Sequence, residues 1–221
     1  FERAGIILRR AEVTVIAGTP GAGKSSIALA MAVRAKLPTL YFSADTNAHT
    51  MAMRLIAMGG NMTQALAEQL LKTNPEKAHE ILLINNHLFW SFESTPTLKD
   101  LDDDVSAFET VWGRSPTLIV VDNLMDTNAA LLVLHHTKEG FEGFPCQPRS
   151  AIQGLVNQVP AMVLTIGQMK QGNDTYLCVA PVKNRYGKAD QTGNNYVSLA
   201  FNPESMYLED VAVRYEQEGM V

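Results

Sequence analysis

The sequence Gly18-Thr19-Pro20-Gly21-Ala22-Gly23-Lys24-Ser25 lies between a β-branched run and a stretch without helix breakers. Its spacing is that of a loop whose backbone N–H groups surround a phosphate. Residues 12–17, EVTVIA, predict a strand before it. Residues 25–36 place apolar side chains on one face and predict a helix after it. The positive end of that helix would face the same phosphate, so this stretch, the phosphate loop, predicts nucleotide binding.

The residues of the phosphate loop have separate expected roles. Lys24 is expected to neutralise the β and γ phosphates of ATP, and the Ser25 hydroxyl to ligate Mg²⁺. The residues expected to contact the nucleotide are Thr19, Pro20, Gly21, Ala22, Gly23, Lys24, Ser25 and Ser26. A glycine-rich turn of chance origin is the alternative, and the flanking strand and helix disfavour it.

Apolar runs that predict strands alternate with helical patterns along the rest of the chain. Further strands are expected at 39–43, 80–84, 117–121, 130–134, 161–166, 176–182 and 196–201, and further helices at 50–58, 63–71, 98–112 and 151–159. Continuous apolar strands indicate a mostly parallel sheet covered by helices on both faces. The last three strands follow one another closely and are expected to be antiparallel at one edge. The prediction is one α/β domain over residues 1–221.

One interval is too short for this arrangement. Only residues 122–129 separate the strands at 117–121 and 130–134. A crossover between parallel strands needs about a dozen residues or more. Either these strands pair in another way, or a helix-sized segment is absent near 123–130. We favour the second interpretation.

Two aspartates that follow predicted strands are candidates for the chemistry of hydrolysis. Asp122 ends the strand at 117–121, where an acidic residue can hold Mg²⁺. Asp45 follows the strand at 39–43 and is expected to orient the attacking water. A role for Asp45 as the N-cap of the next helix stays open.

Five histidines are present, and two of them end a predicted strand. His135 and His136 follow the strand at 130–134. Because successive strand side chains point to opposite faces, we expect only one of the two to reach the nucleotide. The other three, His49, His79 and His87, show no metal-ligand spacing.

Composition narrows the possible partners. The net charge of −5 provides no overall attraction for nucleic acid, so any DNA site must be local. Cys146 and Cys178 are too few and too far apart for a disulfide scaffold, which indicates reduced thiols in a cytoplasmic protein. No apolar run approaches the roughly 18 residues of a membrane span, so we expect no membrane association.

Taken together, the motifs resemble the RecA-like superfamily, specifically the ATPase domain of hexameric helicases of the DnaB and plasmid RepA type. Tyr41-Phe42-Ser43-Ala44-Asp45 is similar to the strand that ends in that family's catalytic glutamate, here an aspartate. Leu134-His135-His136-Thr137 resembles the segment that ends in a γ-phosphate sensor, a role that falls on His136. Val182-Lys183-Asn184-Arg185-Tyr186-Gly187 resembles a late Lys-x-Arg motif that reaches the nucleotide of the neighbouring subunit.

This resemblance implies a RecA-like three-layer fold and an ATP- and Mg²⁺-dependent ring, such as a homo-hexamer. Arg185 would stabilise charge on the phosphoryl group bound by the next subunit, with Lys183 beside it. Without the resemblance, this pair would be only a solvated turn. The chain starts close to its first strand, as in the single-domain plasmid helicase, so the ring is expected to rest on the surfaces of the ATPase domain itself.

The resemblance also implies binding of single-stranded DNA and movement along it during replication. The matching loops are 138–150 and 170–174. Lys138, Arg149 and Lys170 would contact phosphates, and Phe141 or Phe144 would stack on bases. Other functions share the phosphate site. These are a recombinase or mediator that forms filaments, a nucleotide-switched binding protein, and a small-molecule kinase, for which the sequence shows no arginine-bearing lid.

Overall fold

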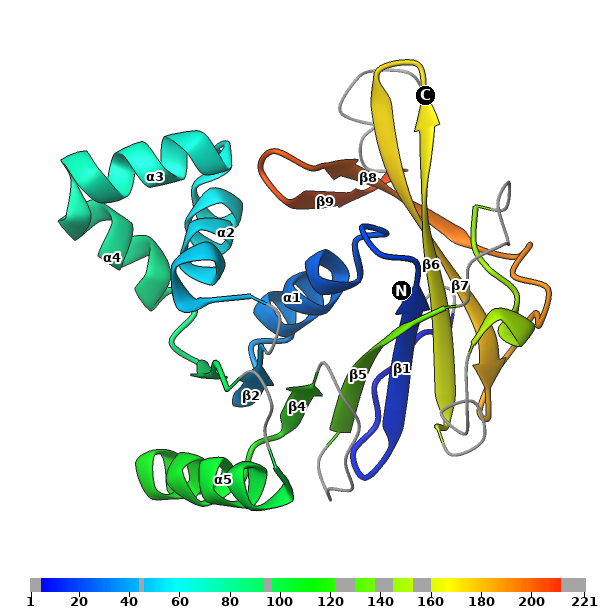
Figure 1. Cartoon of the computed structure of the whole chain (residues 1–221), viewed down its shortest axis with the longest axis horizontal. Coiled ribbons are helices and arrows are strands. Elements are labelled where there is room, and N and C mark those ends of the chain that lie inside the picture. The colour runs from blue at the N-terminus through cyan, green and yellow to red at the C-terminus, as the bar shows by residue number, and fades with distance from the viewer. Residues whose placement is uncertain are drawn as a thin grey trace.

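The computed structural model describes residues 5–43, 46–93, 97–121, 130–137, 145–152 and 160–211. Within them, one nine-stranded sheet has the order β3-β2-β4-β5-β1-β6-β7-β8-β9 (Figure 1). The strands are β1 (Val13–Gly18), β2 (Thr39–Phe42), β3 (Leu88–Ser91), β4 (Leu118–Val121), β5 (Ala130–His136), β6 (Met162–Gln171), β7 (Asp174–Asn184), β8 (Val197–Asn202) and β9 (Tyr207–Asp210). The helices are α1 (Lys24–Ala35), α2 (Ala48–Gly60), α3 (Gln64–Thr73), α4 (Pro75–Leu83) and α5 (Leu98–Trp112).

The sheet has a parallel part and an antiparallel part. β1 pairs in parallel with β5 on one side and with β6 on the other. β2 pairs in parallel with both β3 and β4, and β4 with β5. From β6 onward, β7, β8 and β9 add as antiparallel strands. The predicted mostly parallel sheet with antiparallel strands at one end is confirmed, and β9 is an additional strand that the sequence patterns did not indicate.

Alternate side chains of the strands enter two separate cores. Ile16 of β1 contributes to the core that also contains Ile27 of α1. Its neighbours Val15 and Ala17 contribute to the other core, which contains Phe108 of α5. The two helices therefore cover opposite faces, and in Figure 1 α1 and α5 lie on opposite sides of β2 and β4. The predicted three-layer arrangement is confirmed.

Helices α2, α3 and α4 form a unit with a small core of its own. That core consists of Met53, Ile56, Ala57, Ala67, Ala78 and Ile81. Each helix starts at a side-chain cap, provided by Asn47, Thr63 and Asn74 respectively. The unit lies beyond α1 at the left of Figure 1. It is inserted between the neighbouring strands β2 and β3.

The strand predicted at residues 80–84 is wrong, because residues 80–83 are the last residues of α4 and residue 84 begins the turn that follows it. Pro75 occupies the start of this helix, and the Asn74 side chain accepts a hydrogen bond from Lys77 N. Leu83 and Ile84 are 52% and 60% exposed, which a buried strand would not allow. A short apolar run fits either state, and the proline and the cap at the helix start decide between them. The third strand is instead β3, which follows the turn after α4.

The pairing of β4 with β5 decides one of the two interpretations of the short interval between them. β4 and β5 pair directly and in parallel, so the interpretation that they pair in another way is wrong. Residues 122–129 lie outside the described residues, and a helix-sized absence near 123–130 stays a prediction. Most of the helix predicted at 151–159 also lies outside them. A 3-10 helix occupies Arg149–Ala151. None of the described helices combines the length and apolarity needed to cross a membrane.

Residues 145–152 form a strap that crosses the middle of β6. A Cβ atom at Gly167 would lie 1.6 Å from the carbonyl oxygen of Pro145, so the two backbones touch. Cys146 is fully buried at this crossing, and burial, with a smaller contribution from Cys178, raises the pKa of its thiol. The strap has a second attachment further along, where Arg149 N donates to the carbonyl of Gln191. Both cysteines are buried free thiols.

Candidate nucleotide site

The phosphate loop leaves β1 at the carboxyl edge of the parallel strands and continues directly into α1. Gly21 and Gly23 adopt φ angles of 75° and 92°, in the left-handed region that favours glycine. A Cβ atom at Gly23 would also lie 2.8 Å from a methyl carbon of Leu177 on β7. Ala22 N donates to the carbonyl of Thr19 at 3.1 Å and closes the turn. The spacing of glycines in the sequence therefore matches two positions where a side chain would strain the loop.

Lys24 is buried and reaches back across the phosphate loop. Its Nζ donates to the carbonyl oxygens of Gly18 and Thr19, both at 3.0 Å. The same Nζ lies 3.4 Å from Nδ1 of His136. His136 is the last residue of β5, in register with Gly18 of β1. Parallel pairing of two central strands thus places His136 beside the lysine of the loop. That one residue of the His135-His136 pair reaches the nucleotide stays a prediction.

The two serines after Lys24 differ in what they offer a nucleotide. Ser25 is half-buried in the first turn of α1, a helix whose cap residue Gly23 has no side chain. The predicted role of its hydroxyl in Mg²⁺ binding stays a prediction. Ser26 is buried, and its hydroxyl donates to Sδ of Met206 on the β8–β9 connection. The Ser26 hydroxyl is therefore engaged elsewhere, and the group of Ser26 that can bind a phosphate is its backbone N–H.

Gln168 is a residue of the site that the sequence patterns did not identify. It lies on β6, exposed at the carboxyl edge, and its Nε2 donates to the carbonyl of Gly21 at 3.0 Å. This bond joins the tip of the phosphate loop to a strand that lies 147 residues away in the sequence. No local motif marks such a contact, because it depends on β6 pairing with β1.

We expect Gln168→Ala to weaken ATP binding about three- to tenfold, because one hydrogen bond that holds the loop contributes about 1 kcal/mol. Equilibrium titration with a fluorescent ATP analogue measures the change. Gln171→Ala, an exposed glutamine at the end of the same strand, is the matched control and should bind like the parent. Equal affinity of the two variants would contradict a role for Gln168 in shaping the loop.

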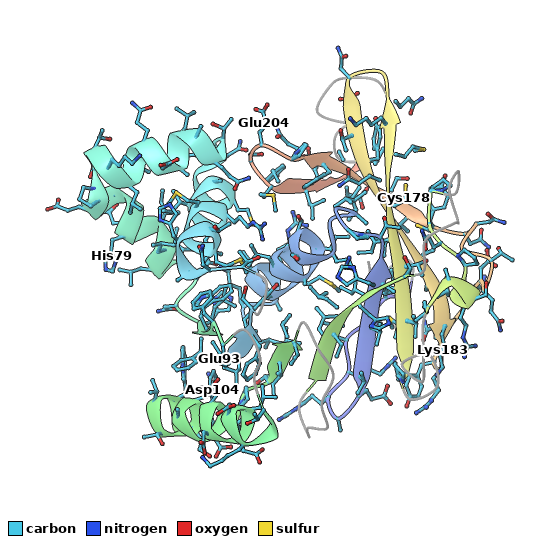
Figure 2. All side chains as sticks on the ribbon, in the orientation of Figure 1. His79, Glu93, Asp104, Cys178, Lys183 and Glu204 are labelled. Carbon is cyan, nitrogen blue, oxygen red and sulfur yellow. The ribbon has the colours of Figure 1, made fainter. Side chains whose placement is uncertain are left out.

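Lys183 and Arg185 do not reach the phosphate loop of their own subunit. Asn184 between them pairs with Met162 at the start of β6, whereas Gly18 lies against Ile166 further along the same strand. Four residues of strand separate these levels by about 13 Å. In Figure 2, Lys183 lies toward the lower end of β7, whereas α1 starts from the upper end of β1. A role of Arg185 at its own phosphate loop is therefore excluded by the register of the sheet.

Three cations gather at this opposite edge. The pKa of Lys183 is lowered by burial and, to a smaller extent, by the charges of Arg149 and Arg185. Arg149 thus lies with the Lys183–Arg185 pair. Lys170 is seven residues further along β6 than the partner of Lys183, about 23 Å away. The predicted DNA contacts Arg149 and Lys170 are therefore not brought together.

Several predicted site residues lie outside the described residues. These are Asp45, Asp122, Lys138, Phe141 and Phe144. The strands that precede the two aspartates end level with each other, since Phe42 of β2 pairs with Val121 of β4. Among the described residues, no group of three or more His, Cys, Asp or Glu side chains could hold a metal ion. The magnesium site predicted from Ser25 and Asp122 stays a prediction.

Comparison with known sequences identifies relatives over nearly the whole chain. The profile of a family described as AAA domain matches residues 5–131. The Gene 65 protein of Mycobacterium phage L5 is 30% identical over 241 residues, covering 95% of this chain and 90% of its own length. The Gene 65 protein of Mycobacterium phage D29 is 32% identical over 233 residues, covering 90% and 98%. Both alignments exceed the 221 residues of this chain, so each relative has residues without a counterpart here.

Comparison with solved structures shows the same fold in an ATPase domain, a helicase and a recombinase. The solved ATPase domain has a TM-score of 0.70 at 14% identity, covering 92% of this chain and 86% of that one. A DnaB-like replicative helicase has a TM-score of 0.71 at 13% identity, covering 92% of this chain and 60% of the helicase. The RadB recombinase has a TM-score of 0.60 at 12% identity, covering 94% of both chains. The predicted RecA-like P-loop ATPase fold is confirmed.

Proposed function

This chain belongs to the AAA domain family, and from that premise we propose that it is the Mg²⁺-dependent ATPase of a ring-forming motor that moves on single-stranded DNA. The observation that carries the proposal is the separation of two cationic groups. Lys24 lies in the phosphate loop at one edge of the sheet, and Arg185 lies at the other. Each is suited to the phosphates of ATP, yet one nucleotide cannot touch both in one subunit. A head-to-tail ring solves this, because it brings the Arg185 edge of one subunit to the phosphate loop of the next.

The residues of the phosphate loop fit a nucleotide. The left-handed Gly21 and Gly23 turn backbone N–H groups inward, and the N-terminal end of α1 adds positive potential. Lys24 is held within reach of bound phosphates by the carbonyls of Gly18 and Thr19. Mg²⁺, with Ser25 and Asp122 as its proposed ligands, would neutralise charge on the β and γ phosphates. In this proposal Asp45 orients the attacking water.

His136 is proposed to sense the γ-phosphate. Its Nδ1 lies 3.4 Å from Lys24 Nζ, so a phosphate that draws the lysine also changes the surroundings of the imidazole. His136 ends β5, and Thr137 beyond it forms an antiparallel bridge with Ile152 of the strap. A displacement of His136 would therefore pass directly to the segment that starts at residue 138, one of the two proposed DNA loops.

DNA-stimulated turnover tests the proposal. We expect single-stranded DNA to raise the ATPase rate of the parent several-fold, because movement on DNA is the work coupled to hydrolysis. Lys24→Ala should show no turnover with or without DNA. Electron microscopy of the same samples with ATP and DNA should show closed rings of about six subunits. A rate indifferent to DNA, with the parent otherwise active, would contradict the motor function and favour a nucleotide-switched binding protein or a kinase.

A filament-forming recombinase is the second candidate, and the similarity to the RadB recombinase favours it. Ring and filament use the same head-to-tail contact and differ in the rotation between neighbours. DNA stimulation is expected in both cases. Open helical polymers on DNA in the same micrographs would therefore favour the filament-forming recombinase over the ring-forming motor.

A further inference from the structure

The turn that carries Arg185 is held by hydrogen bonds of its backbone and of the Asn184 side chain. Arg185 N donates to the carbonyl of Ala161 at 2.9 Å, while the Arg185 side chain is exposed. The Asn184 side chain accepts a hydrogen bond from Tyr186 N at 3.0 Å and shapes the turn. A Cβ atom at Gly187 would lie 2.9 Å from Nδ2 of Asn184, so the turn closes tightly over this amide. The backbone of Arg185 is therefore fixed, while its side chain is exposed to solvent.

The segment before β1, residues 5–12, supplies three further contacts to the same turn. Nδ2 of Asn184 donates to the carbonyl of Gly5 at 3.2 Å. The Arg9 guanidinium lies over the ring of Tyr186, 4.7 Å from its centroid. The hydroxyl of Tyr186 donates to the carboxylate of Glu12. The ring of Tyr186 is thus held by a cation on its face and its hydroxyl by an anion.

This segment is itself anchored at both ends. Ile6 is 3% exposed and belongs to the core around α1. At the other end the segment continues into the central strand β1. Between them Ala11 adopts a φ of 58°, a backbone conformation that non-glycine residues rarely adopt. That bend turns the chain between Arg9 and Glu12, the two residues that reach Tyr186.

We infer that residues 5–12 form a clamp on the Arg185 turn, in which Glu12, Arg9 and Tyr186 act as positioning residues for the neighbouring subunit's nucleotide. The inference rests on the proposed trans role of Arg185. A guanidinium that crosses a subunit boundary is effective only in a narrow geometry, and an error of about 1 Å can cost a hundredfold in rate. The clamp fixes that geometry before the subunits meet. It also links the start of β1, the strand that ends in the phosphate loop, to the turn that serves the next subunit.

Kinetics of the variants Tyr186→Phe and Glu12→Ala test the clamp. Each is expected to lower the kcat for ATP about tenfold and to leave the KM unchanged, because the phosphate loop of the same subunit is untouched. The double variant should be no slower than either single variant, since both remove the same hydrogen bond. Glu12→Gln keeps an acceptor and should retain most of the activity. Tyr207→Phe, an exposed tyrosine on β9, is the matched control and should behave as the parent.

Mixing separates the clamp from a general loss of structure. An excess of Lys24→Ala subunits, which carry an intact clamp and Arg185, should restore turnover per intact phosphate loop in Tyr186→Phe. The same mixture with Arg185→Ala tests the trans role itself. A parental kcat in Tyr186→Phe and Glu12→Ala would overturn the clamp and leave the trans role intact. The same conclusion would follow if Lys24→Ala subunits restored turnover to Arg185→Ala but did not restore it to Tyr186→Phe. Failure to restore Arg185→Ala at any ratio would overturn the trans role and the clamp with it.

Discussion

Replacement of Arg185 by alanine is expected to lower the kcat for ATP about a thousandfold and to leave ATP affinity within about threefold of the parent. The guanidinium lies at the edge of the sheet opposite to the phosphate loop of its own subunit, so it takes no part in binding there. Its planar, permanent charge suits the charge that develops on the phosphoryl group during transfer, which affects rate and not ground-state binding. Steady-state kinetics and equilibrium titration with an ATP analogue measure the two quantities separately.

Two further variants serve as controls for this prediction. Arg114→Ala removes an exposed arginine after α5 and should have parental kinetics. Lys24→Ala should lose both binding and turnover. Mixed in equal amounts, Lys24→Ala and Arg185→Ala should regain about a quarter of the parental rate, because a random head-to-tail ring has about one complete boundary in four. A rise in Kd that matches the fall in kcat would show instead that Arg185 binds the nucleotide of its own subunit.

Replacement of Gly167 by alanine is expected to lower the free energy of unfolding by about 3 kcal/mol or more. The added Cβ would lie 1.6 Å from the carbonyl oxygen of Pro145, so backbone must move and no side-chain rotation relieves the clash. The strap resists such movement because Cys146 is buried and a Cβ at Gly193 would lie 2.8 Å from the carbonyl of Gln147. Urea unfolding followed by circular dichroism measures the loss.

Gly172→Ala is the matched control for the clash. Gly172 has a φ of 61° in the β6–β7 turn, and nothing lies within 4 Å of its Cβ position. The cost there is limited to the left-handed backbone, about 1 to 2 kcal/mol. An equal loss of stability in both variants would mean that the strap yields to the added methyl group. The structure predicts the larger loss at Gly167, where the backbone conformation itself is ordinary.

The phosphate loop and the strands around it could be predicted because their signals are local. The glycine spacing encodes the turn, and alternating apolar residues encode two buried faces, which Val15 and Ile16 show by entering different cores. The helix α4 shows where local signals fail. Its residues 80–84, a glutamate followed by four apolar residues, fit a strand equally well, and the Asn74 cap that decides for a helix lies six residues earlier.

The contacts that complete the site depend on pairing between distant strands. Alternation along β5 indicates that one of two histidines reaches the phosphate loop, but only the register with β1 places His136 beside Lys24. Gln168 belongs to no motif and becomes visible only when β6 lies against β1. The distance between Arg185 and its own phosphate loop follows from the register of β7 on β6, which no sequence pattern contains.

The central position of β1 has a consequence for how the protein is made. Its partners in the sheet are β5 and β6, and the contact of Lys24 with His136 spans 112 residues. During synthesis, the strand that ends in the phosphate loop therefore leaves the ribosome long before either neighbour exists. Contacts of such long sequence separation slow folding and leave unpaired strand edges exposed in the meantime. The nucleotide site is therefore completed only after both β5 and β6 have been made.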